Sequence, residues 1–262
     1  MDIFLFVILG VGVGLLGTLI GAGGGFILLP VLTLLYPEWP AEQVSAVSLF
    51  VVMCNALSGT IGYSRMARID YKSGLIFAAA ALPGALGGAM LTDLASRSVF
   101  NTILGVFLLL ISGFLLVRNR LKPVDGTYDG PSAQEQTTRQ RVVGISISLV
   151  VGVVSSFLGI GGGIIHVPAL IYILGFPVHI AIATSHFVLA ITATAGTATK
   201  LVDGQFGDAL PIAIAIGAGA VIGAQIGAYL SRQIHSMVVV NVMAIAMMAV
   251  AVRILWMGMR GS

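Results

Sequence analysis

The chain has 262 residues, of which 58% are hydrophobic and only 9% charged, with a formal net charge of +3. A soluble domain carries roughly 25% charged residues to cover its surface. The composition therefore excludes a water-soluble globular protein, does not suggest a nucleic-acid partner, and predicts several membrane spans of about 20 residues each.

The first half of the chain predicts four spans. The first, Ile3–Leu35, contains the sequence Gly-Ala-Gly-Gly-Gly at residues 21–25 and is followed by spans over Val44–Tyr63, Gly74–Leu91 and Phe100–Val117. A continuous helix over Ile3–Leu35 would measure about 50 Å, against a hydrocarbon core of about 30 Å. This first span must therefore be either a steeply tilted, interrupted crossing or a re-entrant hairpin.

The second half repeats this order after a polar segment at residues 118–141. The spans predicted there are a broken one over Val142–Leu174, then Ile180–Thr199, Ala209–Leu230 and Val238–Trp256. We predict an all-α integral membrane protein of about eight transmembrane helices in two homologous halves, each with a glycine-broken helix. The predicted division is a first membrane repeat at 1–119, a polar cytoplasmic linker at 120–140 and a second membrane repeat at 141–262.

The repeat rests on matched residues in the same order. Gly-Ile-Gly-Gly-Gly at 159–163 lies 138 positions after its first copy, and Pro30 and Pro168 follow the two copies at the same spacing. The further matches are Ala46-Val47-Ser48 with Ala183-Thr184-Ser185, Asn55 with Thr192, Gly59-Thr60 with Gly196-Thr197, and Gly84 and Gly88 with Gly219 and Gly223. The last pairing has the small-xxx-small pattern of closely packed membrane helices.

Paired helix breaks in corresponding halves indicate a transporter's binding site. Irregular backbone at membrane depth is tolerated only where protein buries it or where it lines a wet cavity, and the start of a helix attracts anions. Hydroxyl and amide donors after each break could bind an anion without a fixed charge. The predicted substrate-binding residues are Gly23, Gly24, Gly25, Ser48, Asn55, Gly161, Gly162, Gly163, Thr184, Ser185 and Thr192.

His166 and His186 are the histidines predicted inside spans, where ionisable residues are costly and are candidates for function. They are either proton-coupling residues or neutral core histidines. No metal site and no cofactor is predicted, and the single cysteine, Cys54, is read as a packing residue.

Lys and Arg predict the orientation. Arg65, Arg68 and Lys72 share one short loop, residues 118–141 are also basic, and the loop at 37–42 has no basic residue. The first two should be cytoplasmic and the third external. Single crossings by the broken spans would put both termini inside and make the halves parallel, whereas hairpins would change the span count and the symmetry. The sequence leaves both alternatives open.

At the two glycine-rich breaks with their prolines, and at the Ala-x-Ser segments after them, the chain resembles the TauE/SafE family over essentially its whole length. The resemblance implies a multi-pass protein of the cell (inner) membrane that moves small sulfur-containing anions such as sulfite or organosulfonates. His166 is a departure, because the family usually has an aliphatic residue there. The partners expected are the anion and the lipid bilayer, and the oligomeric state is left open.

The leading interpretation is therefore a transporter, not an enzyme. An intramembrane enzyme acting on a lipid-soluble substrate is the alternative, but no Asp or Glu lies securely inside a predicted span to complete a catalytic set. We expect export, because an anion leaving the cell moves with the inside-negative potential and needs no energising ion.

Overall fold

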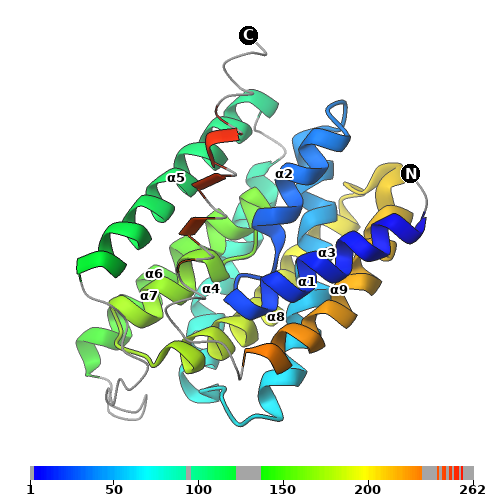
Figure 1. Ribbon diagram of the computed structural model, residues 1–262. Coiled ribbons are helices and arrows are strands. Elements are labelled where there is room, and N and C mark those ends of the chain that lie inside the picture. Colours follow the sequence, from blue (N-terminus) through cyan, green and yellow to red (C-terminus); the bar gives the residue numbers. More distant parts are fainter. Residues whose placement is uncertain are drawn as a thin grey trace.

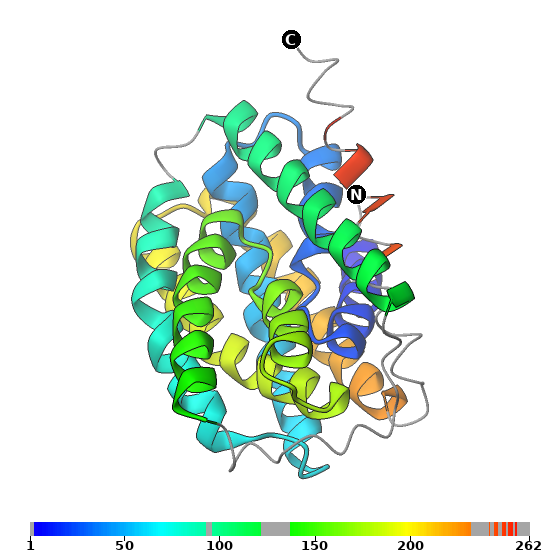
Figure 2. The ribbon, with the colours of Figure 1, turned by 90° about the vertical axis from the view of Figure 1, so that its left-hand side faces the viewer.

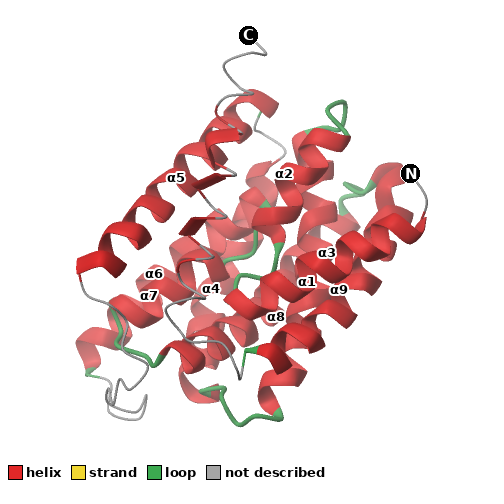
Figure 3. Cartoon of the chain, viewed as in Figure 1, coloured by secondary structure: helices red, strands yellow, loops and turns green. Residues whose placement is uncertain are grey.

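The computed structural model describes residues 3–92, 96–121 and 137–231, and then 241, 244–245, 248–249, 251–253 and 255. These residues are helical or in loops, and none of them forms a strand (Figure 3). Most of the predicted linker and most of the predicted span Val238–Trp256 lie outside the described residues. The prediction of an all-α membrane protein is confirmed, with six described helices long and apolar enough to cross a membrane.

The helices follow the predicted order in both halves (Figure 1). The first half comprises α1 (Ile3–Ile20), α2 (Gly25–Leu35), α3 (Ala41–Ser64), α4 (Tyr71–Leu91) and α5 (Arg97–Leu121). The second comprises α6 (Thr138–Leu158), α7 (Gly163–Tyr172), α8 (Val178–Val202), the short 3₁₀ helix η3 (Gly207–Ala209) and α9 (Leu210–Leu230). Each predicted broken span is thus two helices, α1 with α2 and α6 with α7.

Each half packs its first helix on the other half. Helix α1 lies along α9, with Gly10 against the backbone of Ile216 and Gly227 against that of Leu15. Helix α6 lies along α4 in the same way, with Gly144 against the Phe77 ring and Gly88 against the backbone of Val153. Glycines let these backbones approach closely, as expected for small-xxx-small packing in membranes.

The register of this packing corrects two pairings made from the sequence, that of Gly84 with Gly219 and that of Gly88 with Gly223. Gly84 packs against Leu149 and Val153, and these residues match Val11 and Leu15, which contact Gly223. Gly84 is therefore the counterpart of Gly223 rather than of Gly219. A glycine pattern that repeats every four residues looks the same after a shift of one helical turn, so the sequence alone could not fix the register.

The first broken span is a hairpin. Helix α3 runs parallel to α9, because Phe50 contacts Gly217 at one end and Gly62 contacts Ala228 at the other. Helix α1 also runs parallel to α9, so α1 and α3 point the same way and α2 must return the chain to the end where α1 begins. Eleven residues of α2 span about 16 Å, roughly half of a bilayer core.

The second broken span is built in the same way. Helix α8 runs parallel to α4, since Phe187 contacts Gly74 near one end and Lys200 contacts Thr92 at the other. Helix α6 is parallel to α4 too, so α7 returns the chain to the start of α8.

The matched helices α3 and α8 run in opposite directions. Gly59 on α3 packs against His186 near the start of α8, whereas Leu49 near the start of α3 packs against Gly196 further along α8. Two equivalent helices that cross antiparallel make the two halves inverted copies. The hairpin alternative therefore holds, and the single-crossing alternative with parallel halves is excluded.

The core sits between these crossed halves. Buried residues from α1, α2, α3, α7 and α8 form one large apolar cluster, and α5 lies along the outside of the bundle (Figures 1 and 2). Helix α5 joins that cluster through one face, with the Phe100 ring 5.9 Å from the Phe157 ring of α6. The two helix breaks lie in the interior (Figure 3).

Candidate functional site

The two breaks have the non-helical geometry that the sequence predicts. Residues 21–24 and 159–162 lie outside any helix, and α2 and α7 begin at the last glycine of each copy. Gly23 and Gly161 both have φ of 76°, in the left-handed region that glycine adopts without strain. The prediction of interrupted helices is confirmed.

The breaks meet each other across the interface between the halves. Gly23 and Gly161 both contact the same two side chains, Val52 of α3 and Leu189 of α8. Val52 and Leu189 are themselves matched residues of the two halves, so they mark the centre of the inverted repeat. Gly163, at the start of α7, packs directly on Gly21 of the opposite break.

Two of the predicted binding residues, Ser48 and Ser185, bond to the break of the opposite half. The Ser48 hydroxyl donates to the carbonyl oxygen of Gly159 at 2.6 Å, and the Ser185 hydroxyl donates to that of Gly21 at 3.5 Å. A carbonyl at a helix end loses its intrahelical partner and needs another when buried. These hydroxyls therefore stabilise the breaks, whatever else they bind.

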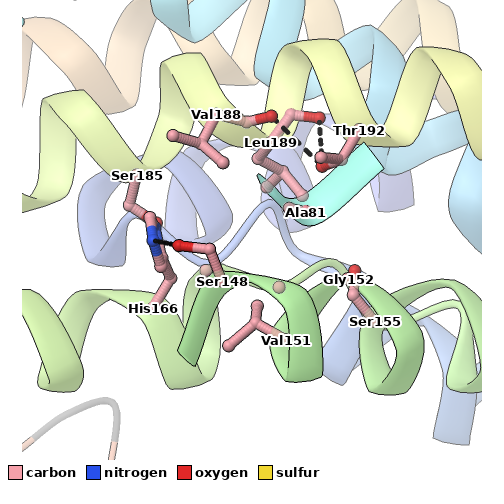
Figure 4. Close-up of a pocket in the computed structure, with 12 residues that line it drawn as sticks. Ala81, Ser148, Val151, Gly152, Ser155, His166, Ser185, Val188, Leu189 and Thr192 are labelled. Carbon is pink, nitrogen blue, oxygen red and sulfur yellow. Dashed lines mark hydrogen bonds between the residues drawn. The ribbon is translucent and has the colours of Figure 1, made fainter. Parts of the chain in front are cut away.

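A small cavity lined by both apolar and polar side chains lies beside the second break (Figure 4). Its volume is about 10 Å³, enough for about one water molecule. Helices α4, α6, α7 and α8 surround it, and its polar side chains are Ser148, Ser155, His166, Ser185 and Thr192. Of the predicted site residues, the cavity brings together Gly162, Gly163, His166, Ser185 and Thr192.

His166 is the one ionisable side chain on this cavity. It is 3% exposed, its Nε2 lies 3.2 Å from the Ser148 hydroxyl, and the Phe77 ring packs edge-on against it at 5.7 Å. Its Nδ1 is buried and has no hydrogen-bond partner.

The start of α7 lies at the same cavity. Gly162 and Gly163 line it, and no side chain caps either α7 or α2. The first N–H groups of a helix have no intrahelical acceptor and carry the positive end of the helix dipole. The cavity thus combines hydroxyls, an imidazole and a helix N-terminus with no carboxylate among its lining residues.

Other predicted residues form a second buried cluster. Thr18 donates to Asn55 Oδ1 at 2.7 Å and lies 3.3 Å from His186 Nε2, while Tyr63 donates to the Thr18 carbonyl at 2.7 Å. Asn55 Nδ2 is buried there without a partner. Asn55 and His186 therefore lie together, but away from the cavity beside the second break.

Thr184 and Lys200 have roles that the sequence did not indicate. The Thr184 hydroxyl accepts the backbone N–H of Asp70 at 3.0 Å, which ties α8 to the loop before α4. Lys200 is fully buried, with Nζ 3.0 Å from Gln205 Oε1 and 3.4 Å from Thr92 Oγ1.

Ser148 and Ser155 were missed by the sequence analysis. Their counterparts 138 positions earlier are Gly10 and Gly17, so a search for positions where one half is polar and the other is glycine would have found them. Within the described residues no three side chains of His, Cys, Asp or Glu gather as a metal site.

Comparison with known proteins decides the family. A family model described as "Sulfite exporter TauE/SafE" matches residues 6–254. The chain belongs to the TauE/SafE family. Its recognition from the glycine breaks is confirmed.

Relatives of this TauE/SafE protein are named as probable membrane transporters. A probable membrane transporter protein of Bacillus subtilis, YunE, is 31% identical over 98% of this chain and 99% of its own length. A probable membrane transporter protein of Methanocaldococcus jannaschii is 26% identical over 75% of this chain and 72% of its own. No solved structure matches. With its apolar helices, the protein is a multi-pass integral membrane transporter.

Proposed function

We propose that this TauE/SafE protein exports a small sulfur-containing anion, such as sulfite or an organosulfonate, across the cell (inner) membrane. The observation that carries the proposal is the cavity beside the second break, where hydroxyls and a helix N-terminus converge without a carboxylate. The family description names a sulfite exporter, and sulfite is a small anion of the kind proposed here.

Neutral donors would hold the anion. Ser185 and Thr192 on α8 have hydroxyls that donate to backbone carbonyls in this structure and would turn toward the anion when it enters, and Gly162 and Gly163 offer the N-terminal backbone of α7. Hydrogen bonds to a charged ligand are each worth about 1.5–3 kcal/mol. A few such donors bind an anion well enough to select it and weakly enough to release it.

The cavity must widen to admit the anion, because about 10 Å³ holds only about one water. On this proposal, the structure is a state in which the site is contracted. Inverted repeats rock against each other around a fixed site, so the same cavity would open first to one side of the membrane and then to the other. Ser48 and Asn55 lie outside this cavity, and the described residues of the first half hold no second copy of it.

The direction of transport follows from the membrane potential. Moving one negative charge outward gains about 2.3 kcal/mol per 100 mV, so export needs no energising ion. The loop at 65–70 and the start of α6, with Arg139 and Arg141, lie at one end of the bundle. We place that basic end in the cytoplasm. His166 and His186 are the candidates for any proton that moves with the anion.

An enzyme would need more than the structure offers at this cavity. Ser148 and His166 are paired, as a nucleophile and a base would be. However, the Ser148 hydroxyl also bonds the Gly144 carbonyl at 2.7 Å, and no carboxylate lines the cavity to orient the imidazole. The pair therefore fits ligand binding better than catalysis.

The test is exchange of radiolabelled sulfite across proteoliposomes loaded with unlabelled sulfite. Thr192→Val should weaken apparent affinity by about tenfold or more, because one donor to a charged ligand is lost. Thr194→Val is the matched control, since both threonines bond back to their own helix but Thr194 does not line the cavity. No exchange of sulfite or of any sulfonate by the wild type would refute the proposal.

A further inference from the structure

The two halves differ where they face the cavity. At the 138-residue offset, the second half has Ser148, Ser155 and His166 where the first half has Gly10, Gly17 and Leu28. In the first half Gly10 and Gly17 pack straight onto neighbouring backbone, so no equivalent space is left. The cavity is thus found beside the break of the second half and not beside that of the first, and His166 is its distinguishing residue.

The contacts of Ser148 assign the hydrogen on the His166 ring. A hydroxyl has one hydrogen, and the Ser148 oxygen lies 2.7 Å from the Gly144 carbonyl and 3.2 Å from His166 Nε2. The shorter contact joins two oxygens, so the hydroxyl hydrogen must lie there. Nε2 must then donate to Ser148, and in a neutral imidazole Nδ1 is left as a bare acceptor.

The opposite assignment fails on two counts. It would set two oxygen lone pairs against each other at 2.7 Å. It would also put a hydrogen on Nδ1, which is buried without a hydrogen-bond partner. A buried donor left unpaired costs about 1–3 kcal/mol.

A bare acceptor is unusual in a site for anions. His166 lines the cavity and its Nδ1 has no partner, so an anion oxygen that reaches Nδ1 would face its lone pair unless a hydrogen lay between them. No other titratable side chain lines the cavity, and Phe77 covers the ring with apolar carbon. The hydrogen must therefore come from an O–H of the ligand or from a proton that binds Nδ1.

We infer that this site selects anions that bring a hydrogen, such as hydrogen sulfite, with their O–H donated to Nδ1 of His166. An anion of equal charge without an O–H, such as methanesulfonate, enters only together with a proton on Nδ1. In both cases one hydrogen accompanies each anion. The inference rests on the proposed transport of sulfur anions and narrows its substrate class.

The experiment measures equilibrium binding of radiolabelled sulfite to the purified protein, with methanesulfonate as competitor. It is done at pH values below and above the pKa of hydrogen sulfite. In the wild type, sulfite affinity should fall about tenfold per pH unit once hydrogen sulfite ionises. Methanesulfonate should compete at least about tenfold more weakly than hydrogen sulfite, since a site built for an O–H rejects analogues that lack it.

Three variants separate the outcomes. His166→Leu, which introduces the leucine found at this position in the first half, should abolish the preference for hydrogen sulfite over methanesulfonate. Ser148→Ala should reduce that preference, because the ring can then take either tautomer. His179→Gln should leave the preference unchanged, because His179 lies outside the cavity. Magnetic resonance of ¹⁵N-labelled histidine, which needs no transport, should show Nδ1 of His166 without hydrogen in the neutral ring.

Binding of sulfite and methanesulfonate with equal affinity, or a preference that survives His166→Leu, would overturn the inference while leaving anion transport intact. A hydrogen found on Nδ1 of the neutral ring would also overturn it. If no sulfur anion binds at any pH, the proposed function fails and the inference falls with it.

Discussion

The Ser48 hydroxyl on α3 lies 2.6 Å from the carbonyl oxygen of Gly159, in the break that belongs to the other half. Its counterpart Ser185 reaches the Gly21 carbonyl at a longer 3.5 Å. Each half thus satisfies a backbone group that the other half exposes by breaking its helix. The unequal lengths mean that the second break is tied more firmly than the first.

Ser48→Ala should lower the free energy of unfolding by about 1–3 kcal/mol, because the Gly159 carbonyl is left buried without its donor. Thermal unfolding in detergent measures the effect. Ser185→Ala should cost less, and Ser64→Ala, at an exposed hydroxyl bonded within its own turn, should cost nothing. Equal losses in Ser48→Ala and Ser64→Ala would contradict this account of the break.

Two adjacent glycines of α4 give a test of the interhelical packing. Gly88 touches the backbone of Val153 on α6, whereas a methyl group at Gly87 would meet no atom within 4 Å. Gly88→Ala should therefore destabilise the protein by about 1–3 kcal/mol through overpacking. Gly87→Ala should stabilise it by up to about 1 kcal/mol through helix propensity. Similar unfolding temperatures for the two variants would show that α4 and α6 are less tightly packed.

The left-handed backbone of the breaks can be tested apart from their packing. Gly161 has φ of 76° and faces Val52, whereas Gly204 has φ of 69° and open space around it. Gly204→Ala should lose only about 1–2 kcal/mol, the cost of left-handed backbone for alanine. Gly161→Ala should lose more stability and also reduce transport. A Gly161→Ala protein with wild-type transport would argue against a role for the break.

The hairpins predict the side on which each loop lies. Cys54 is the single cysteine, so a Cys54→Ser background allows one new cysteine at a time. In that background Ile3→Cys and Glu38→Cys should react with an impermeant thiol reagent from the same side of the membrane, and Arg68→Cys from the other. Labelling of Ile3→Cys and Glu38→Cys from opposite sides would show that the first broken span crosses the membrane once and is not a hairpin.

Much of this arrangement could be predicted from the sequence, because glycine-rich breaks inside apolar stretches have few structural explanations. The breaks, their place in the two halves and the helical spans follow from spacing and composition. The direction of α2 does not, since a kinked crossing and a hairpin have the same sequence pattern. Contacts between α1, α3 and α9 were needed to decide it.

The site was predicted only in part, and for a physical reason. Thr192 and Ser185 lie on the cavity, but Asn55 sits in a separate buried cluster although it matches Thr192 in the repeat. The repeat identifies equivalent residues in the two halves, but it does not indicate which half has a cavity beside them. Space depends on the size of the facing side chain: Gly17 in the first half packs directly on the backbone of Gly24, whereas Ser155 in the second places a side chain against Gly162.

The exchange of helices between the halves has a consequence for assembly during synthesis. Helix α1 leaves the ribosome first, yet its glycine face is made for α9, which is synthesised about 200 residues later. Until then, nearly the whole chain must wait in the bilayer with that face against lipid. The first half cannot mature as an independent unit, and a chain truncated before α9 should be recognised by membrane quality control as unassembled.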